Sequence, residues 1–189
     1  MKIIETKEAK CNCKKVYLRK LIEENKYRRI MEIGVAVGGS AEEMIKGALK
    51  NFSEEKIKYY GFDLFTTAWY DKYNGDLMED VERKLAKTGA DINLFRGDTR
   101  KILKTVLEKI PLIDFVYIDG GHKREEVKND WEAVKRVVGS KTLIVFDDYH
   151  LKGVKKVVDS INEKEFEKEI VKLKELPKGL MVEVRIKSA

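Results

Sequence analysis

The stretch from Met31 to Ser40 constrains the fold of this chain most, because a short apolar run there breaks into a glycine turn. The apolar run is Ile30–Ile33, and residues 41–45 then have the spacing of an amphipathic helix. This pattern predicts a strand, a tight turn and a helix. Ser40 and Glu43 have the spacing of a capping box, which predicts that the helix begins where the turn ends.

The glycines of this turn make it a candidate ligand site. Glycine lets backbone N–H groups approach a ligand closely, and a helix N-terminus favours a carboxylate or a phosphate. The spacing here is E-x-G-x-x-x-G-x-S, which differs from the dinucleotide motif G-x-G-x-x-G. Taken alone, the turn is as compatible with an ordinary strand–helix connection as with ligand binding.

Further strand and helix patterns follow along the chain. Strands are predicted at Arg29–Glu32, Lys58–Asp63, Ile92–Arg96, Ile113–Ile118 and Thr142–Phe146. Helices are predicted at residues 8–26, from the glycine turn to about Asn51, and from Asp76 to Lys87. The next helix is predicted to begin after Asp98 as its N-cap. A fifth helix runs through Val127, Trp131, Val134 and Val138 up to Gly139, and a sixth through Val154–Ile161. Alternation around Val171 and over Leu180–Ile186 predicts an antiparallel hairpin. The order predicts one α/β domain with a mainly parallel sheet and helices on both faces.

Length and composition limit the class of protein. The 189 residues contain no repeat or linker, which predicts a single domain with a helical segment at 1–28 and a core at 29–189. There is neither a membrane-spanning apolar run nor a signal peptide, so we expect a cytoplasmic protein that does not bind membranes. The 39 bases and 33 acids are typical of an ion-paired, thermophilic surface, although the surplus of bases is compatible with nucleic acid. The hairpin edge and the N-terminal helix are candidate contacts of a homo-oligomer.

Polar side chains follow the predicted strands at their carboxyl ends, where ligands bind in such sheets. They are Glu32, Asp63, Gly97-Asp98-Thr99, Asp119 with His122, and Asp147-Asp148 with His150. Three carboxylates close together are costly unless they are protonated or bound to a cation, and hard oxygen ligands suit Mg²⁺. The sequence therefore predicts a metal site at Asp119, Asp147 and Asp148. The alternative is that these aspartates are separate helix N-caps, Asp148 above all.

The order of these motifs resembles that of class I S-adenosylmethionine-dependent methyltransferases, especially the small metal-dependent O-methyltransferases of the catechol and macrolide-sugar types. The matching motifs are the glycine turn, I-D-F-V-Y-I-D-G-G-H and T-L-I-V-F-D-D-Y, within about Arg29 to Tyr149. The resemblance implies a Rossmann-like fold with a mainly parallel seven-stranded sheet that ends in an antiparallel hairpin. It also implies that Asp119, Asp147 and Asp148 bind the metal.

By the same resemblance, S-adenosylmethionine would contact the strand ends. The implied cofactor residues are Glu32, Gly34, Val35, Ala36, Gly38, Gly39 and Ser40 for the methionine part, Asp63 for the ribose, Gly97, Asp98 and Thr99 for the adenine, and Asp119 beside them. The catechol-type enzymes have a lysine base three residues after the first metal aspartate, where this chain has His122. Histidine titrates nearer neutrality and suits that role. The alternatives are that His122 is a metal ligand or structural, or that His150 is the base.

We therefore expect an S-adenosylmethionine-dependent O-methyltransferase that acts on a hydroxyl of a small molecule with the help of Mg²⁺, with Asp119 and His122 as catalytic residues. One rival is a metal-independent methyltransferase of RNA or protein, and another is a non-catalytic nucleotide-binding module. In the predicted loop 64–75, Trp69, Tyr70 and Tyr73 form either a lid over an acceptor pocket or a partner surface.

Overall fold

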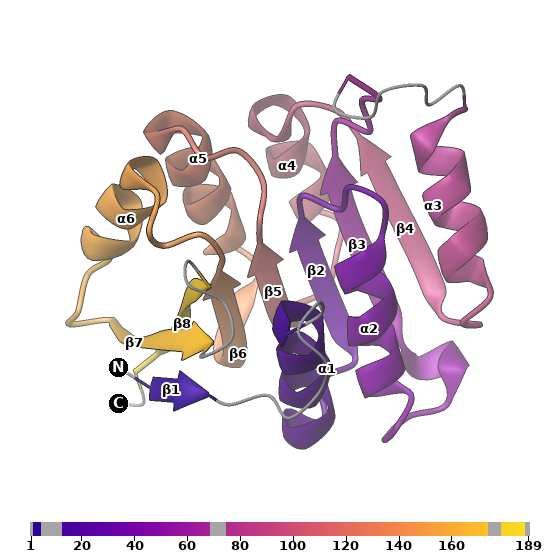
Figure 1. The fold of residues 1–189 in the computed structure, drawn as a ribbon, viewed down its shortest axis with the longest axis horizontal. Coiled ribbons are helices and arrows are strands. Elements are labelled where there is room, and N and C mark those ends of the chain that lie inside the picture. Colours follow the sequence, from indigo (N-terminus) through magenta and orange to yellow (C-terminus); the bar gives the residue numbers. More distant parts are fainter. Residues whose placement is uncertain (1, 5–12, 69–74, 174–178, 188–189) are drawn as a thin grey trace.

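The computed structural model describes residues 2–4, 13–68, 75–173 and 179–187. The strands are β1 (Lys2–Ile4), β2 (Arg29–Ile33), β3 (Lys58–Asp63), β4 (Asp91–Arg96), β5 (Ile113–Ile118), β6 (Val138–Phe146), β7 (Phe166–Leu173) and β8 (Leu180–Ile186). The helices are α1 (Cys13–Asn25), α2 (Gly39–Ala48), α3 (Leu77–Ala86), α4 (Thr99–Leu107), α5 (Arg124–Val134) and α6 (Lys152–Asp159), with a short 3₁₀ helix, η1 (Glu54–Lys56). Figure 1 shows their arrangement.

The strands form one sheet in the order β1-β7-β8-β6-β5-β2-β3-β4. The predicted seven strands, β2 to β8, are confirmed, and β1 adds an eighth at the edge, parallel to β7. Among the strands of the described residues, only β8 runs antiparallel to its neighbours, β6 and β7, as the predicted hairpin requires. The strand order reverses between β2 and β5, which pair in parallel. This topological switch point is where a sheet of this kind binds its ligands.

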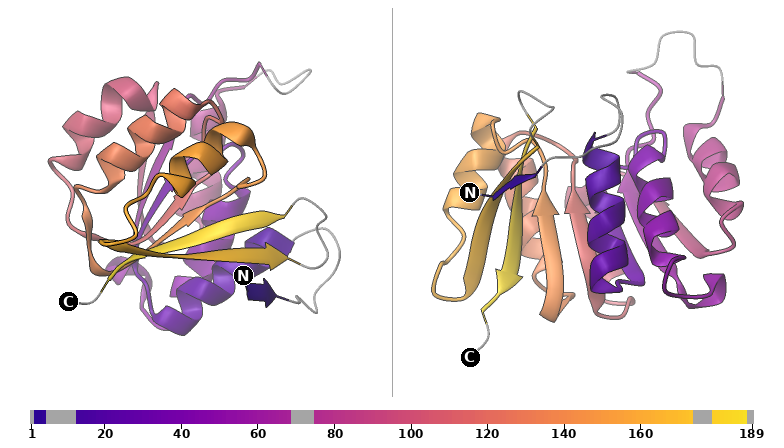
Figure 2. Two further views of the ribbon diagram at one scale, coloured as in Figure 1. Left: turned by 90° about the vertical axis from the view of Figure 1, so that its left-hand side faces the viewer. Right: turned by 60° about the horizontal axis from the view of Figure 1, so that its bottom comes forward.

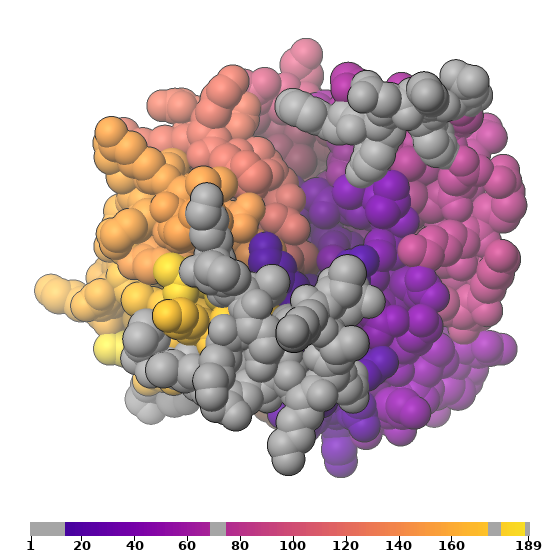
Figure 3. Space-filling model, viewed as in Figure 1, coloured from indigo at the N-terminus to yellow at the C-terminus, as the bar shows by residue number. Residues whose placement is uncertain are grey.

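Helices cover both faces of the sheet because the central strands are apolar on both sides. Ile30 of β2 lies in the core beneath α1, α2 and α3, whereas the next residue, Met31, lies in the core beneath α4, α5 and α6. Successive side chains of a strand point to opposite faces, so a continuous apolar run fills both cores. Figure 2 shows the sheet between the two helical layers. In Figure 3, the indigo-to-magenta and the orange-to-yellow parts of the chain occupy opposite sides of the molecular surface.

The predicted α5 is too long at its C-terminal end. Val138 continues the apolar spacing of that helix, but α5 ends at Val134 and Val138 begins β6. Val138 pairs with Ile113 of β5, and its side chain packs, partly buried, against the core beneath α4, α5 and α6. Gly139 does not end the helix either, since its N–H donates to the Thr142 hydroxyl at 2.8 Å within β6. Among the described residues, no helix is both long enough and apolar enough to cross a membrane.

Candidate functional site

The loop after β2 is in direct contact with the loop after β5. Gly34 has a φ of +93°, and a Cβ built on it would lie only 2.1 Å from the carbonyl oxygen of Asp119. Gly34 N–H donates to Phe62 O at 2.8 Å, and Asp119 N–H donates to Ile33 O at 2.8 Å. A side chain at position 34 would therefore separate strand ends that hydrogen bonds hold together.

The glycine turn ends two residues earlier than the capping-box pattern predicts, because the N-cap is Gly38 instead of Ser40. Gly38 is the N-cap of α2 with a left-handed φ of 70°, and no side chain caps this helix. The predicted capping box is wrong because the left-handed turn at Gly38 places Ser40 inside the first turn of α2. Glu43 instead accepts a hydrogen bond from Arg19 of α1 at 3.0 Å.

Asp63 at the end of β3 connects two loops. Its Oδ2 accepts the N–H of Ala36 at 2.9 Å, and its Oδ1 accepts the N–H of Phe65 at 2.7 Å. A carboxylate oxygen has two lone pairs, so each oxygen retains one for a hydroxyl of a ligand. Phe65 itself is buried in the core beneath α1, α2 and α3, whereas Trp69, Tyr70 and Tyr73 lie outside the described residues.

A cavity of about 830 Å³ opens at the carboxyl ends of β2, β3, β4 and β5. Seven residues predicted to bind the cofactor line it: Gly34, Ala36, Asp63, Gly97, Asp98, Thr99 and Asp119. Five others, Glu32, Val35, Gly38, Gly39 and Ser40, are not among its lining residues. The volume is in the range of small-molecule and cofactor sites.

Glu32 precedes the glycine turn in β2 and is almost completely buried. The Tyr59 hydroxyl donates to its carboxylate. Burial raises the pKa of Glu32 well above its ordinary value, although the hydrogen bond from Tyr59 lowers it. Glu32 and Tyr59 therefore form a buried hydrogen-bonded pair between β2 and β3.

Asp98 is the N-cap of α4, as predicted, and accepts the N–H of Arg100 at 3.0 Å. Its hydrogen bonds with the Arg100 side chain lower the pKa of Asp98 to about 2. The next residue, Thr99, donates its hydroxyl to Asp130 of α5, and burial raises the pKa of that carboxyl to about 6. These contacts hold the start of α4 against α5 at one wall of the cavity.

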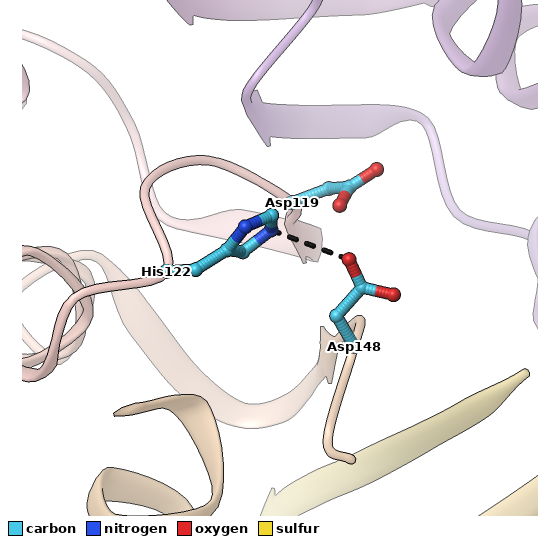
Figure 4. A group of neighbouring side chains, drawn as sticks. All are labelled: Asp119, His122 and Asp148. Carbon is cyan, nitrogen blue, oxygen red and sulfur yellow. Dashed lines mark ion pairs between the residues drawn. The ribbon is translucent and has the colours of Figure 1, made fainter. Parts of the chain in front are cut away.

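Three side chains converge where the loops after β5 and β6 meet. Asp119 and His122 follow β5 and Asp148 follows β6, and Figure 4 shows all three pointing toward one another. One ligand atom from each lies within 4.8 Å of the other two. His122 Nε2 is 3.2 Å from Asp148 Oδ2, whereas His150 Nδ1 is 3.9 Å from Asp148 Oδ1. Among the described residues, this is the group with metal-ligand spacing.

Asp147 lies beside this group but has other partners. Its side chain is fully buried, and its Oδ2 accepts the Tyr117 hydroxyl at 2.5 Å and the Lys14 ammonium at 2.7 Å. Its Oδ1 accepts the N–H of Asp148 at 2.7 Å. The structure thus brings two of the three predicted metal ligands together with His122 and places the third against a lysine.

Lys14 was missed by the sequence analysis, because nothing distinguishes it from the other lysines of the predicted N-terminal helix. Its ammonium also lies 3.3 Å from Asp148 Oδ1. Burial disfavours the charged form of Lys14, but Asp147 and Asp148 outweigh burial and raise its pKa. Burial, followed by the charge of Asp147, raises the pKa of Asp119 to about 8, while Lys14 opposes this shift. Ionising all three carboxylates together is therefore unfavourable even with Lys14 present.

Comparisons with known proteins agree with the fold. Residues 31–149 match the model of a family described as a methyltransferase domain. An O-methyltransferase from Bacillus cereus, solved in complex with SAH, has 14% identity and a TM-score of 0.73 over 92% of this chain and 80% of its own. The O-methyltransferase TomG from Streptomyces achromogenes, solved with SAM, has 13% identity and a TM-score of 0.70 over 93% and 80%. The SAH-bound methyltransferase PaMTH1 from Podospora anserina has 13% identity and a TM-score of 0.68 over 93% and 78%. No curated protein matches the chain.

Proposed function

The chain belongs to the methyltransferase-domain family, and on this premise we propose that it transfers the methyl group of S-adenosylmethionine to a hydroxyl oxygen of a small molecule with the help of a divalent metal ion. The observation that carries the proposal is the convergence of Asp119, His122 and Asp148 at the edge of the cavity. Asp119 and His122 line the cavity and also belong to the group with metal-ligand spacing. A cofactor in the cavity and a metal at this group would therefore be neighbours.

The residues present fit a divalent ion. Asp119 and Asp148 offer carboxylate oxygens, the ligands that Mg²⁺ prefers, and the imidazole of His122 lies beside them. The raised pKa of Asp119 reflects a buried carboxylate that lacks sufficient positive charge nearby. A bound ion would supply this charge and lower the pKa of an acceptor hydroxyl.

Other side chains of this site would bind the cofactor and accept the proton of the acceptor hydroxyl. Asp63, held by the N–H groups of Ala36 and Phe65, would accept hydrogen bonds from the hydroxyls of a ribose. His122 would take the acceptor's proton on Nδ1, with Nε2–H donating to Asp148. The carboxylate of Asp148 would then stabilise the imidazolium that forms. Holding donor and acceptor in one cavity accounts for much of the rate of such a transfer.

Calorimetry on chelator-treated protein tests both parts of the proposal. We expect S-adenosylmethionine to bind, and we expect Mg²⁺ to produce a heat of binding of its own. Cofactor binding without any response to Mg²⁺ would support the methyltransferase assignment but contradict the proposed metal dependence. This result would favour the metal-independent alternative. Absence of cofactor binding in both conditions would contradict the proposed function altogether.

Two variants separate the roles of the site residues. Asp148→Asn should abolish the Mg²⁺ heat and leave cofactor binding intact, because Asp148 does not line the cavity. Asp159→Asn is the matched control, since it removes the same charge from an exposed ion pair with Lys155. His122→Gln should retain the Mg²⁺ heat and lose transfer to a panel of catechols and vicinal diols. Loss of the heat in this variant would make His122 a metal ligand instead of the base.

A further inference from the structure

Lys14, near the N-terminal end of the chain, contacts the two aspartates that follow β6. It lies in the first turn of α1, 133 positions before Asp147, and its ammonium is 2.7 Å from Asp147 Oδ2 and 3.3 Å from Asp148 Oδ1. Its side chain is about one-third exposed, whereas that of Asp147 is fully buried. The contact is therefore partly enclosed, which sets it apart from the exposed ion pairs of the surface.

Asp147 has little capacity left for another ligand. The two lone pairs of Oδ2 are used by Lys14 and Tyr117, and Oδ1 already accepts the N–H of Asp148. A metal ion bound through Oδ2 would have to displace the ammonium or the Tyr117 hydroxyl, and Oδ1 retains a single lone pair. Asp119 and Asp148, in contrast, face each other together with His122.

The net charge of the site also favours metal binding by Asp119 and Asp148 without Asp147. Asp119, Asp147 and Asp148 carry three negative charges when ionised, and Lys14 supplies one positive charge within hydrogen-bonding distance. Two negative charges remain, which is the charge that one divalent ion neutralises. A second divalent ion would meet an excess of positive charge.

We propose that the ammonium of Lys14 forms an ion pair with Asp147 and prevents this carboxylate from binding the metal, so that the site takes a single divalent ion on Asp119 and Asp148. This inference rests on the proposed metal-assisted function. It makes Lys14 a positioning residue whose charge sets the affinity of the metal site. Because two cations a few ångströms apart repel each other, removing the ammonium should strengthen metal binding.

The test is a titration of chelator-treated protein with Mn²⁺, in which electron paramagnetic resonance counts the free ion. The wild type should bind one equivalent. Lys14→Met should bind Mn²⁺ at least about tenfold more tightly, given the size of unit-charge interactions at this range. Lys14→Arg keeps the charge and should bind with the affinity of the wild type. Lys20→Met is the matched control, since it removes the same charge from an exposed position on α1 and should change nothing.

A double variant tests the assignment of Asp147. Lys14→Met combined with Asp147→Asn leaves the charge of the site unchanged, so it should bind Mn²⁺ like the wild type. A large loss of affinity in this folded double variant would make Asp147 a ligand and overturn the inference. Unchanged affinity in Lys14→Met would overturn it as well. If neither the wild type nor Lys14→Met binds Mn²⁺, the proposed metal assistance itself fails, a result distinct from the other two.

Discussion

Gly34→Ala tests whether contact between the loops after β2 and β5 is essential to the fold. The added Cβ would lie 2.1 Å from Asp119 O, 2.5 Å from Asp119 C and 2.8 Å from Gly120 N. These are backbone atoms of a strand end, so they cannot move aside as a flexible side chain would. The φ of +93° is also unfavourable for alanine.

The magnitude of the effect follows from these two contributions. The left-handed backbone costs alanine about 1–2 kcal/mol. Overpacking against a fixed backbone typically costs about 1–3 kcal/mol more. We therefore expect Gly34→Ala to lower the free energy of unfolding by about 2–5 kcal/mol. With a urea m-value of about 2 kcal/mol/M, the unfolding midpoint should fall by about 1–2.5 M.

Urea unfolding followed by circular dichroism measures this change, and Gly139→Ala is the matched control. Gly139 lies in β6, where a Cβ would meet only Leu112 Cδ1 at an ordinary 3.5 Å. The control should shift the free energy of unfolding by less than about 1 kcal/mol. If the two variants unfold at the same urea concentration, the close approach of Gly34 to Asp119 has no energetic importance.

Three further substitutions have expected outcomes. Asp130→Asn should raise the free energy of unfolding by about 2–3 kcal/mol near pH 8 and hardly at all near pH 3.5. The folded pKa of Asp130, about 6, exceeds the ordinary 3.8, so the wild type loses stability as the pH rises from 3.8 through 6. Equal gains at both pH values in urea unfolding would contradict this. Tyr59→Phe removes the donor to buried Glu32 and should lower the unfolding free energy by about 1–3 kcal/mol, visible as a lower melting temperature. Asp63→Ala removes the acceptor of two backbone N–H groups and should weaken S-adenosylmethionine binding at least about tenfold by calorimetry, whereas unchanged affinity would remove Asp63 from the site.

The sequence predicts the strand ends well because they depend on local patterns. An apolar run that ends in an acid predicted β3 and Asp63, and the same logic placed Asp119 and Asp148 on neighbouring strands. Residues 147 and 148 are adjacent, and the sequence does not decide which of them faces the site. The structure turns Asp147 inward, and Asp148, with a φ of 50°, faces His122.

Long-range contacts are the part that local patterns could not predict. Lys14 belongs to a helix with many lysines, and only the packing of α1 beside α2 directs it toward the end of β6. Val138 shows the opposite problem, because its apolar character is needed by β6 and coincides by chance with the spacing of α5. Both errors arise where tertiary contacts decide the role of a residue whose local pattern is ambiguous.

Asp119 gives the site an additional property, because its main chain and its side chain face different neighbours. Its carbonyl group lies against Gly34 at the floor of the cavity, and its carboxylate lies in the group with His122 and Asp148. A cofactor that shifts the glycine turn would press on the main chain of Asp119, which carries the carboxylate of the group with His122 and Asp148. We therefore expect thermodynamic coupling between cofactor and metal, and linkage requires that each changes the affinity of the other by the same factor.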